Sequence, residues 1–204
     1  VRDTSDRDYE WLESIWLRNQ FMANSDRTVG KLFSLSANLP NFLERFPDSK
    51  ILYISRDPLA VIPSGLSLVT GVLDKRFGFW NLPFEKRRHF INRLYHGLVQ
   101  LLLRFHSDWT REKIDKSKVM IVPFDRMMGD FDNLMNEILE FTNHSPSEEL
   151  RKDIQDTADK QRKFKSEHKY DLEKFGLTEH QIHEDCAPIY ETFIHSTKPE
   201  IKEE

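Results

Sequence analysis

The chain of 204 residues has very little of several features that would identify other classes of protein. It contains one cysteine, Cys186, so an internal disulfide is excluded and no cysteine pair is available for a zinc finger. The longest apolar run in a helical pattern, residues 98–105, is interrupted by Gln100 and Arg104, so no membrane span or signal peptide is visible. The net charge is −4, which argues against a general nucleic-acid binder. We therefore expect a protein of a reducing compartment, the cytoplasm, that binds no nucleic acid.

Metal ligands are also missing from the sequence pattern. Eight histidines are present and form no obvious metal set: His180 and His183 share a helical face, but no third ligand accompanies them. No pair of carboxylates stands out as an acid–base couple either. We therefore expect no metal site.

What the sequence does contain is enough apolar residues for a sizeable core, at 38% of the chain. Two continuous β-prone runs, residues 50–55 and 119–122, predict buried strands, and residues 31–35 form a shorter strand-like run. Helical patterns cover residues 8–22, 36–46, 83–111, 147–159 and 178–194, and two further helices start after Asp57 and at Asp130 or Asp132. Alternating strands and helices predict an α/β fold with a parallel sheet, in one domain over residues 1–196 with a flexible tail at 197–204. Three strands are few for a complete doubly wound domain.

The most informative segment runs from a turn at residues 46–48 through the first predicted strand into the next helix. Arg56 stands at the exit of the strand, Asp57-Pro58 is a favourable helix start, and Ser64 follows eight residues after the arginine. Pro63 is expected to kink this helix or to end it early. Open α/β sheets bind ligands beyond the carboxyl ends of their strands, and a guanidinium grips a phosphate through charge-assisted hydrogen bonds. The alternative is a surface arginine paired with Asp57, and a small serine that needs no function.

Lys31 follows Gly30, but the pair is not part of a Walker A loop. That loop needs a glycine five residues earlier and Ser or Thr after the lysine, and those places hold Ser25 and Leu32. Lys31 opens the strand-like run at 31–35, so both a functional and a purely structural role stay open.

Residues 160–170 form a basic segment with five Lys or Arg and one His, interleaved with Phe164 and Tyr170. We expect this segment to be a loop. It is either a solvated surface or an anion-binding loop anchored by its aromatic rings.

Together these motifs resemble the sulfotransferase superfamily, in particular its bacterial-type members, which use 3′-phosphoadenosine 5′-phosphosulfate (PAPS) as sulfuryl donor. The resemblance covers roughly residues 27–194 and rests on Phe46-Pro47-Asp48, Arg56-Asp57-Pro58, Ser64, the 119–128 segment and the basic segment. It implies a P-loop NTPase-like parallel sheet flanked by helices, with a helix-rich C-terminal half. It further implies a small-molecule, carbohydrate or lipid acceptor. Four aromatic residues between the predicted helices could line the entrance for the acceptor or could simply pack in the core, and both alternatives stay open: Phe77, Phe79, Trp80 and Phe84.

The same resemblance assigns roles to individual residues. Arg56 and Ser64 would bind the 3′-phosphate of the donor, and Lys31 would lie close to the transferred sulfuryl group. Phosphate contacts would also come from three residues of the basic segment, namely Arg162, Lys163 and Lys165.

One departure from the family pattern concerns the N-terminus. Residues 1–30 contain no Gly-rich turn after a strand that would hold the 5′-phosphosulfate, and the chain starts at Val1 rather than Met. We expect either that the sequence begins downstream of this loop or that the loop has been lost. Phe33 stands where the family has a histidine, so no general base is identified. A P-loop nucleotide kinase relative would need the missing Walker A loop, and a non-catalytic scaffold or interaction domain with the same fold remains the alternative from another class.

Overall fold

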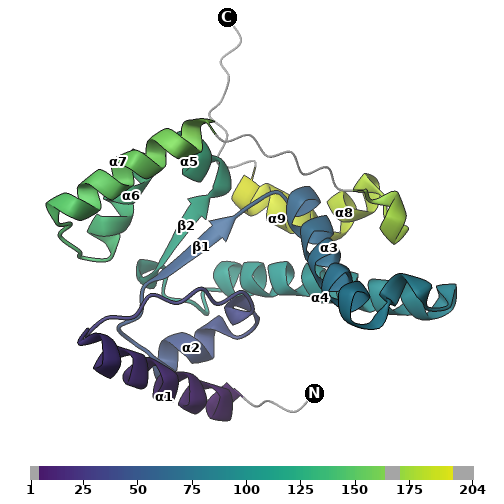
Figure 1. The fold of residues 1–204 in the computed structure, drawn as a ribbon, viewed down its shortest axis with the longest axis horizontal. Helices are drawn as coiled ribbons and strands as arrows, with labels where there is room; N and C mark the ends of the chain where they lie inside the picture. Colours follow the sequence, from purple (N-terminus) through teal and green to yellow (C-terminus); the bar gives the residue numbers. More distant parts are fainter. Residues whose placement is uncertain (1–4, 164–170, 195–204) are drawn as a thin grey trace, which may run out of the picture.

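The computed structural model describes residues 5–163 and 171–194, and helices dominate these ranges around a small parallel sheet (Figure 1). The sheet consists of β1, Ile51–Ser55, and β2, Val119–Pro123, with Ile51 opposite Val119 and Ser55 opposite Pro123. Both predicted strands are confirmed, but β1 is not buried on both faces as expected, since Leu52 and Ile54 are exposed. The chain is therefore a helix-rich α/β protein.

The part of the chain before β1 contains α1, Ser5–Ala23, the 3₁₀ turn η1, Leu35–Ala37, and α2, Leu39–Arg45. Rings of α1 pack edge-on against α2, with Trp16 6.2 Å from Phe42. The strand expected at residues 31–35 is wrong, because residues 31–34 are irregular and η1 follows. Leu32 and Phe33 are exposed and pair with no other strand, so their β propensity has no ladder to join.

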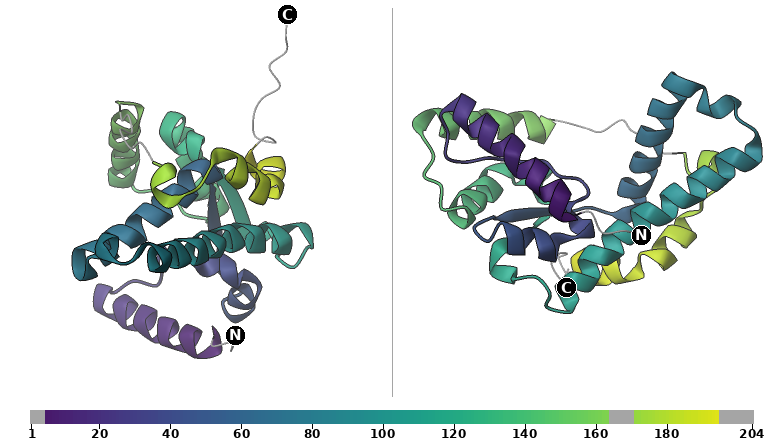
Figure 2. Two further views of the ribbon diagram at one scale, coloured as in Figure 1. Left: turned by 90° about the vertical axis from the view of Figure 1, so that its right-hand side faces the viewer. Right: turned by 90° about the horizontal axis from the view of Figure 1, so that it is seen from below.

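A pair of long helices projects from the sheet (Figure 2). α3, Pro58–Phe77, begins directly after β1, and α4, Phe84–Thr110, follows the short turn η2, Phe79–Asn81. The helices lie close together at Gly65, where an added Cβ would come within 3.0 Å of the Leu98 side chain. Pro63 is buried inside α3 and does not end the helix, contrary to the early break expected as one outcome.

The C-terminal half is helical on both sides of the sheet. Its elements are η3, Lys116–Lys118, α5, Phe124–Gly129, α6, Phe131–Phe141, α7, Glu148–Lys163, η4, Glu173–Phe175, α8, Glu179–Asp185, α9, Ala187–Ile189, and a π-helical turn, Tyr190–Ile194. Residues 160–163 were expected in a loop but form the last turn of α7, directly after the buried Ala158 of the same helix. The single helix expected at 178–194 is broken after Asp185, because Pro188 lacks the N–H that would continue the ladder. Residues 164–170 and the tail at 197–204 lie outside the described residues.

The main core lies between one face of the sheet and the helices α2, α3, α4, α8 and α9. Tyr53 of β1 stacks on Phe105 of α4 at 3.5 Å between ring centroids, and Phe193 packs beside both. The alternate residues of β1, Leu52 and Ile54, are exposed. The two strands are thus held from the α4 side, which fixes the position of their carboxyl ends.

None of the described helices is long and apolar enough to cross a membrane.

Candidate functional site

The candidate site lies where β1 and β2 end. Ser55 and Pro123 are paired at the last position of the two parallel strands, so the next residues, Arg56 and Phe124, emerge side by side. The Arg56 guanidinium carbon lies 4.1 Å from the centroid of the Phe124 ring. The helices α3 and α5 start at this same edge of the sheet (Figure 1). The structure therefore places a cation on an aromatic platform at the position where open α/β sheets bind ligands.

Arg56 is half-buried, and no neighbour within residues 5–163 and 171–194 neutralises its charge. Among the described residues, no hydrogen bond or ion pair engages its side chain. Asp57, the partner in the alternative interpretation, has other contacts: its Oδ1 accepts the Leu59 N–H at 2.8 Å and the Tyr190 hydroxyl at 2.7 Å. The carboxylate thus caps α3 and leaves the donors of Arg56 available for an anion from outside.

Tyr190 fixes this arrangement from the C-terminal end of the chain. Burial and the hydrogen bond to Asp57 raise the pKa of the Tyr190 phenol, so the hydroxyl stays protonated and donates to the carboxylate. Three residues later, the Phe193 carbonyl accepts the buried Ser55 hydroxyl at 3.4 Å. The segment after Pro188 therefore fixes the turn between β1 and α3 through hydrogen bonds to Asp57 and Ser55.

Ser64 and Lys31 differ in how the structure places them. Ser64 is half-buried in the second turn of α3, about 10 Å along the helix from its start, within the same strand–turn–helix unit as Arg56. Lys31 lies on the surface of the irregular stretch between α1 and η1. No interaction in the described part of the chain joins the Lys31 side chain to Arg56 or Ser64. The structure thus brings Arg56 and Ser64 onto one unit and leaves Lys31 on a separate segment.

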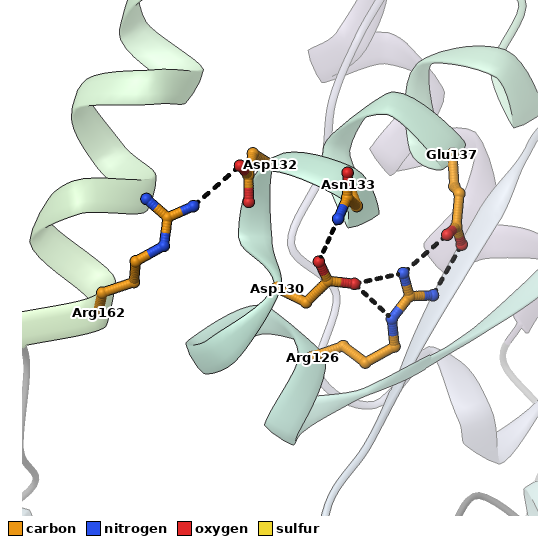
Figure 3. A network of polar contacts seen from close by, with 6 residues as sticks. All are labelled: Arg126, Asp130, Asp132, Asn133, Glu137 and Arg162. Atoms are coloured by element: carbon orange, nitrogen blue, oxygen red, sulfur yellow. Dashed lines mark hydrogen bonds and ion pairs between the residues drawn. The ribbon is translucent and has the colours of Figure 1, made fainter.

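The basic segment enters the structure only through its first residues. Arg162 binds Asp132 of α6 at 2.9 Å (Figure 3). It also binds Asp159 of its own helix at 2.8 Å. Lys163 is exposed at the end of α7, and Lys165 lies outside the described residues. Arg162 therefore ties α7 to α6 in this structure, and binding a phosphate would require it to release these carboxylates.

A second arginine joins α5 to α6 beside it. Arg126 contacts Glu137 through both terminal nitrogens at 2.7 Å and Asp130 at 2.9 Å, and Asn133 donates to the other Asp130 oxygen (Figure 3). Hydrogen bonds from Arg126 hold the pKa of both carboxyls below their ordinary values, and the same bonds raise the pKa of the guanidinium. This network fixes α5, whose first residue is Phe124, so it supports the platform under Arg56.

Two residues of the site, Phe124 and Tyr190, were not predicted from the sequence. For Phe124 a signal was available, because the residues that follow two parallel neighbouring strands must lie at one edge. Tyr190 is 133 residues from Asp57 in the chain, and no local pattern connects them. Among the aromatic residues considered for an acceptor entrance, Phe79 is buried and Trp80 is half-buried, so these two pack, whereas Phe77 and Phe84 are exposed.

Two hollows of the described residues lie away from the candidate site. They are found at the far end of the α3–α4 pair and at the end of α1, and Arg56 lines neither. No group of three or more His, Cys, Asp or Glu side chains in the described ranges is arranged to hold a metal ion.

Comparison with known proteins identifies the family. A sequence model described as "Sulfotransferase family" matches residues 7–149, which is more than two thirds of the chain and includes Lys31, Arg56 and Ser64. The match ends within α7, before the basic residues at 160–170. A search of curated proteins and a search of solved structures gave no match. On the strength of the family match, with the strand–arginine–helix unit at its centre, this chain belongs to the sulfotransferase family.

Proposed function

We propose that the protein transfers a sulfuryl group from PAPS to a hydroxyl or amine of a small-molecule, carbohydrate or lipid acceptor. The observation that carries this proposal is the state of Arg56, which is half-buried, stacked on Phe124 and free of any carboxylate among the described residues. A cation in that state fits a phosphate dianion, since it has donors to offer and no internal ion pair to break. The family match supports sulfuryl transfer as the reaction.

In this proposal the donor's 3′-phosphate binds at the carboxyl edge of a P-loop NTPase-like sheet. Arg56 supplies the charge-assisted hydrogen bonds and Ser64 supplies a hydroxyl from α3. Lys163 and Lys165 add positive charge from the basic segment. Arg162 joins them only by exchanging Asp132 and Asp159 for the phosphate, so its contribution is the smallest of the three.

The reaction needs positioning and charge stabilisation more than covalent chemistry. The acceptor oxygen or nitrogen forms a bond to sulfur while the bond from sulfur to the 5′-phosphate breaks, and the acceptor's proton leaves to solvent or to a base. An in-line transfer of this kind spreads negative charge over the transferring group, as in phosphoryl transfer. Lys31 would neutralise that charge, which requires its exposed segment to approach the site when the donor is bound.

Calorimetry with two nucleotides tests the binding half of this proposal. We expect the protein to bind adenosine 3′,5′-bisphosphate more tightly than adenosine 5′-monophosphate, which lacks the 3′-phosphate. Ser64→Ala should weaken binding of the bisphosphate about 3- to 30-fold, as expected for loss of one hydrogen bond to a charged group. Ser67→Ala, an exposed serine on the same helix, serves as the matched control and should bind as the wild type. Equal affinity for both nucleotides would contradict the proposal and favour a scaffold role.

A further inference from the structure

The far end of the α3–α4 pair, residues 73–94, combines exposed apolar side chains with a net positive charge, and we name it the tip. Large apolar side chains are exposed there: Phe77 is 73% exposed, Phe84 62% and Leu82 40%. Between residues 74 and 93 the sequence has six Lys or Arg and two acidic residues, a net charge of +4 in a chain whose total is −4. Exposed aromatic and aliphatic side chains within a basic segment are the composition of surfaces that bind anionic lipid interfaces.

The tip is also hollowed on one side. A groove of about 890 Å³ lies between the end of α3 and the start of α4. Its apolar lining comes from both helices and the turn between them, namely Leu73, Phe77, Phe79, Leu82, Phe90 and Leu94. Lys86, His89 and Arg93 line it as well, and their i, i+3, i+7 spacing puts them on one face of α4. One acidic side chain, Glu85, also lines the groove. The groove thus combines an apolar floor with a row of basic side chains along one edge.

These basic side chains have no acidic partner among the residues that the structure describes. Both acidic residues of the tip are already engaged: Asp74 accepts the Trp80 N–H at 3.0 Å, and Glu85 pairs with Arg88 at 2.7 Å. No hydrogen bond or ion pair within the described ranges involves the side chains of Lys86, His89 or Arg93. The positive charge of the groove is therefore left for a partner outside the chain.

The tip is held rigidly enough to present this surface. Gly78 caps α3 in the left-handed conformation with φ of 65°, which returns the chain towards α4. The Trp80 ring is covered from the other side by the Lys174 ammonium at 4.5 Å and by Phe175 at 6.2 Å. α3 has 20 residues, so the tip lies about 30 Å from Arg56 along this helix. The groove is therefore separate from the candidate nucleotide site.

We propose that the tip docks on the surface of a membrane that contains anionic lipids. Phe77, Leu82 and Phe84 enter the boundary between headgroups and acyl chains. Lys86, His89 and Arg93 contact lipid phosphates, with the lysine and arginine stems lying along the apolar lining. Projection of the helix pair away from the sheet lets the tip reach a flat surface before the rest of the molecule does (Figure 2). This inference does not rest on the proposed sulfuryl transfer.

Co-sedimentation of the full chain with lipid vesicles tests the inference. We expect binding to vesicles of phosphatidylglycerol and phosphatidylcholine, weaker binding at high salt, and little binding to phosphatidylcholine alone. Lys86→Gln combined with Arg93→Gln should lower the partition coefficient about 25-fold, at about fivefold for each cation near an anionic surface. Phe77→Ser with Leu82→Ser should lower it about tenfold through lost apolar burial.

Matched controls carry the same changes elsewhere. Arg151→Gln with Lys152→Gln removes two exposed cations of α7, and Phe21→Ser with Met22→Ser removes exposed apolar residues at the end of α1. Both controls should partition as the wild type, and thermal melts confirm that all variants fold.

Equal losses in the tip and control variants would overturn the inference, since binding would then follow total charge or total apolar surface. Binding of monomeric dodecyl phosphate without binding to vesicles would assign the groove to a dissolved amphiphile, and self-association through the tip would assign it to a second copy; either result also overturns it.

Discussion

The contact between Arg56 and Phe124 orients a guanidinium without neutralising it. A carboxylate at the same place would fix the arginine equally well, but it would compete with any anionic ligand for the same donors. An aromatic face at 4.1 Å stabilises the cation through its quadrupole and leaves the N–H groups free in the plane of the guanidinium. The nearest acid in the sequence, Asp57, is turned to Leu59 and Tyr190 instead. The Phe124 ring thus orients the arginine without occupying the N–H donors that an anionic ligand would use.

Substitution of Phe124 tests this positioning role. Phe124→Leu keeps an apolar side chain but removes the ring, so it should weaken binding of adenosine 3′,5′-bisphosphate about 2- to 30-fold, the range expected for one cation–π contact. Phe124→Tyr keeps the ring face and should bind within about twofold of the wild type. Calorimetry in an Arg56→Ala background separates positioning from general loss of structure. There, Phe124→Leu should have no further effect, and an undiminished effect in that background would assign Phe124 to packing alone.

Arginine–carboxylate contacts join the helices after β2. Arg126 connects α5 with α6, and Arg162 connects α6 with α7. α5 begins with Phe124, so the position of the platform under Arg56 depends on the Arg126 network. The Arg126 contacts are partly exposed, and the lowered pKa values of Asp130 and Glu137 make their contribution to stability depend on pH.

The pH dependence of stability distinguishes Arg126 from an ordinary surface arginine. Asp130 and Glu137 have folded-state pKa values below their ordinary values of 3.8 and 4.5, because Arg126 donates to their ionised forms. Their contribution to stability is therefore complete above about pH 5 and is lost as the pH falls through the lowered pKa values. Arg126→Gln should lower the melting temperature most at pH 7 and least at pH 3.

Thermal melts of Arg126→Gln and of a control variant at both pH values check this prediction. Arg18→Gln removes an exposed arginine of α1 that has no ion pair within the described chain, and its effect on the melting temperature should be small and similar at both pH values. A destabilisation by Arg126→Gln that is equally large at pH 3 and pH 7 would show that the guanidinium acts through packing rather than through its carboxylates.

Taken as a whole, the molecule shows which of its features are encoded locally. β1, β2, α3 and α4 were predictable because their apolar runs, and the Asp57-Pro58 start of α3, act within a few residues of each other. The site itself depends on longer connections: the register of two strands puts Phe124 beside Arg56, and Asp132 neutralises Arg162 from 30 residues away. The strand expected at residues 31–35 failed for the same reason, since β propensity produces a strand only where a partner edge is available. Arg56 and Ser64 were therefore readable from the sequence as candidates, whereas Phe124, Tyr190 and the ion pairing of Arg162 depend on contacts made only in the fold.

The most direct test of the central claim removes the Arg56 guanidinium and the 3′-phosphate in turn. Calorimetry measures the affinity of the wild type and of Arg56→Ala for nucleotides with and without the 3′-phosphate. Arg56→Ala should weaken binding of adenosine 3′,5′-bisphosphate about 10- to 100-fold, as expected for loss of charge-assisted hydrogen bonds. The same variant should bind adenosine 5′-monophosphate within about twofold of the wild type, because that nucleotide has no 3′-phosphate to lose. Arg76→Ala, at the opposite end of α3, should bind both nucleotides as the wild type does. If Arg56→Ala binds the bisphosphate as tightly as the wild type, Arg56 does not hold the 3′-phosphate and the account of the site is wrong.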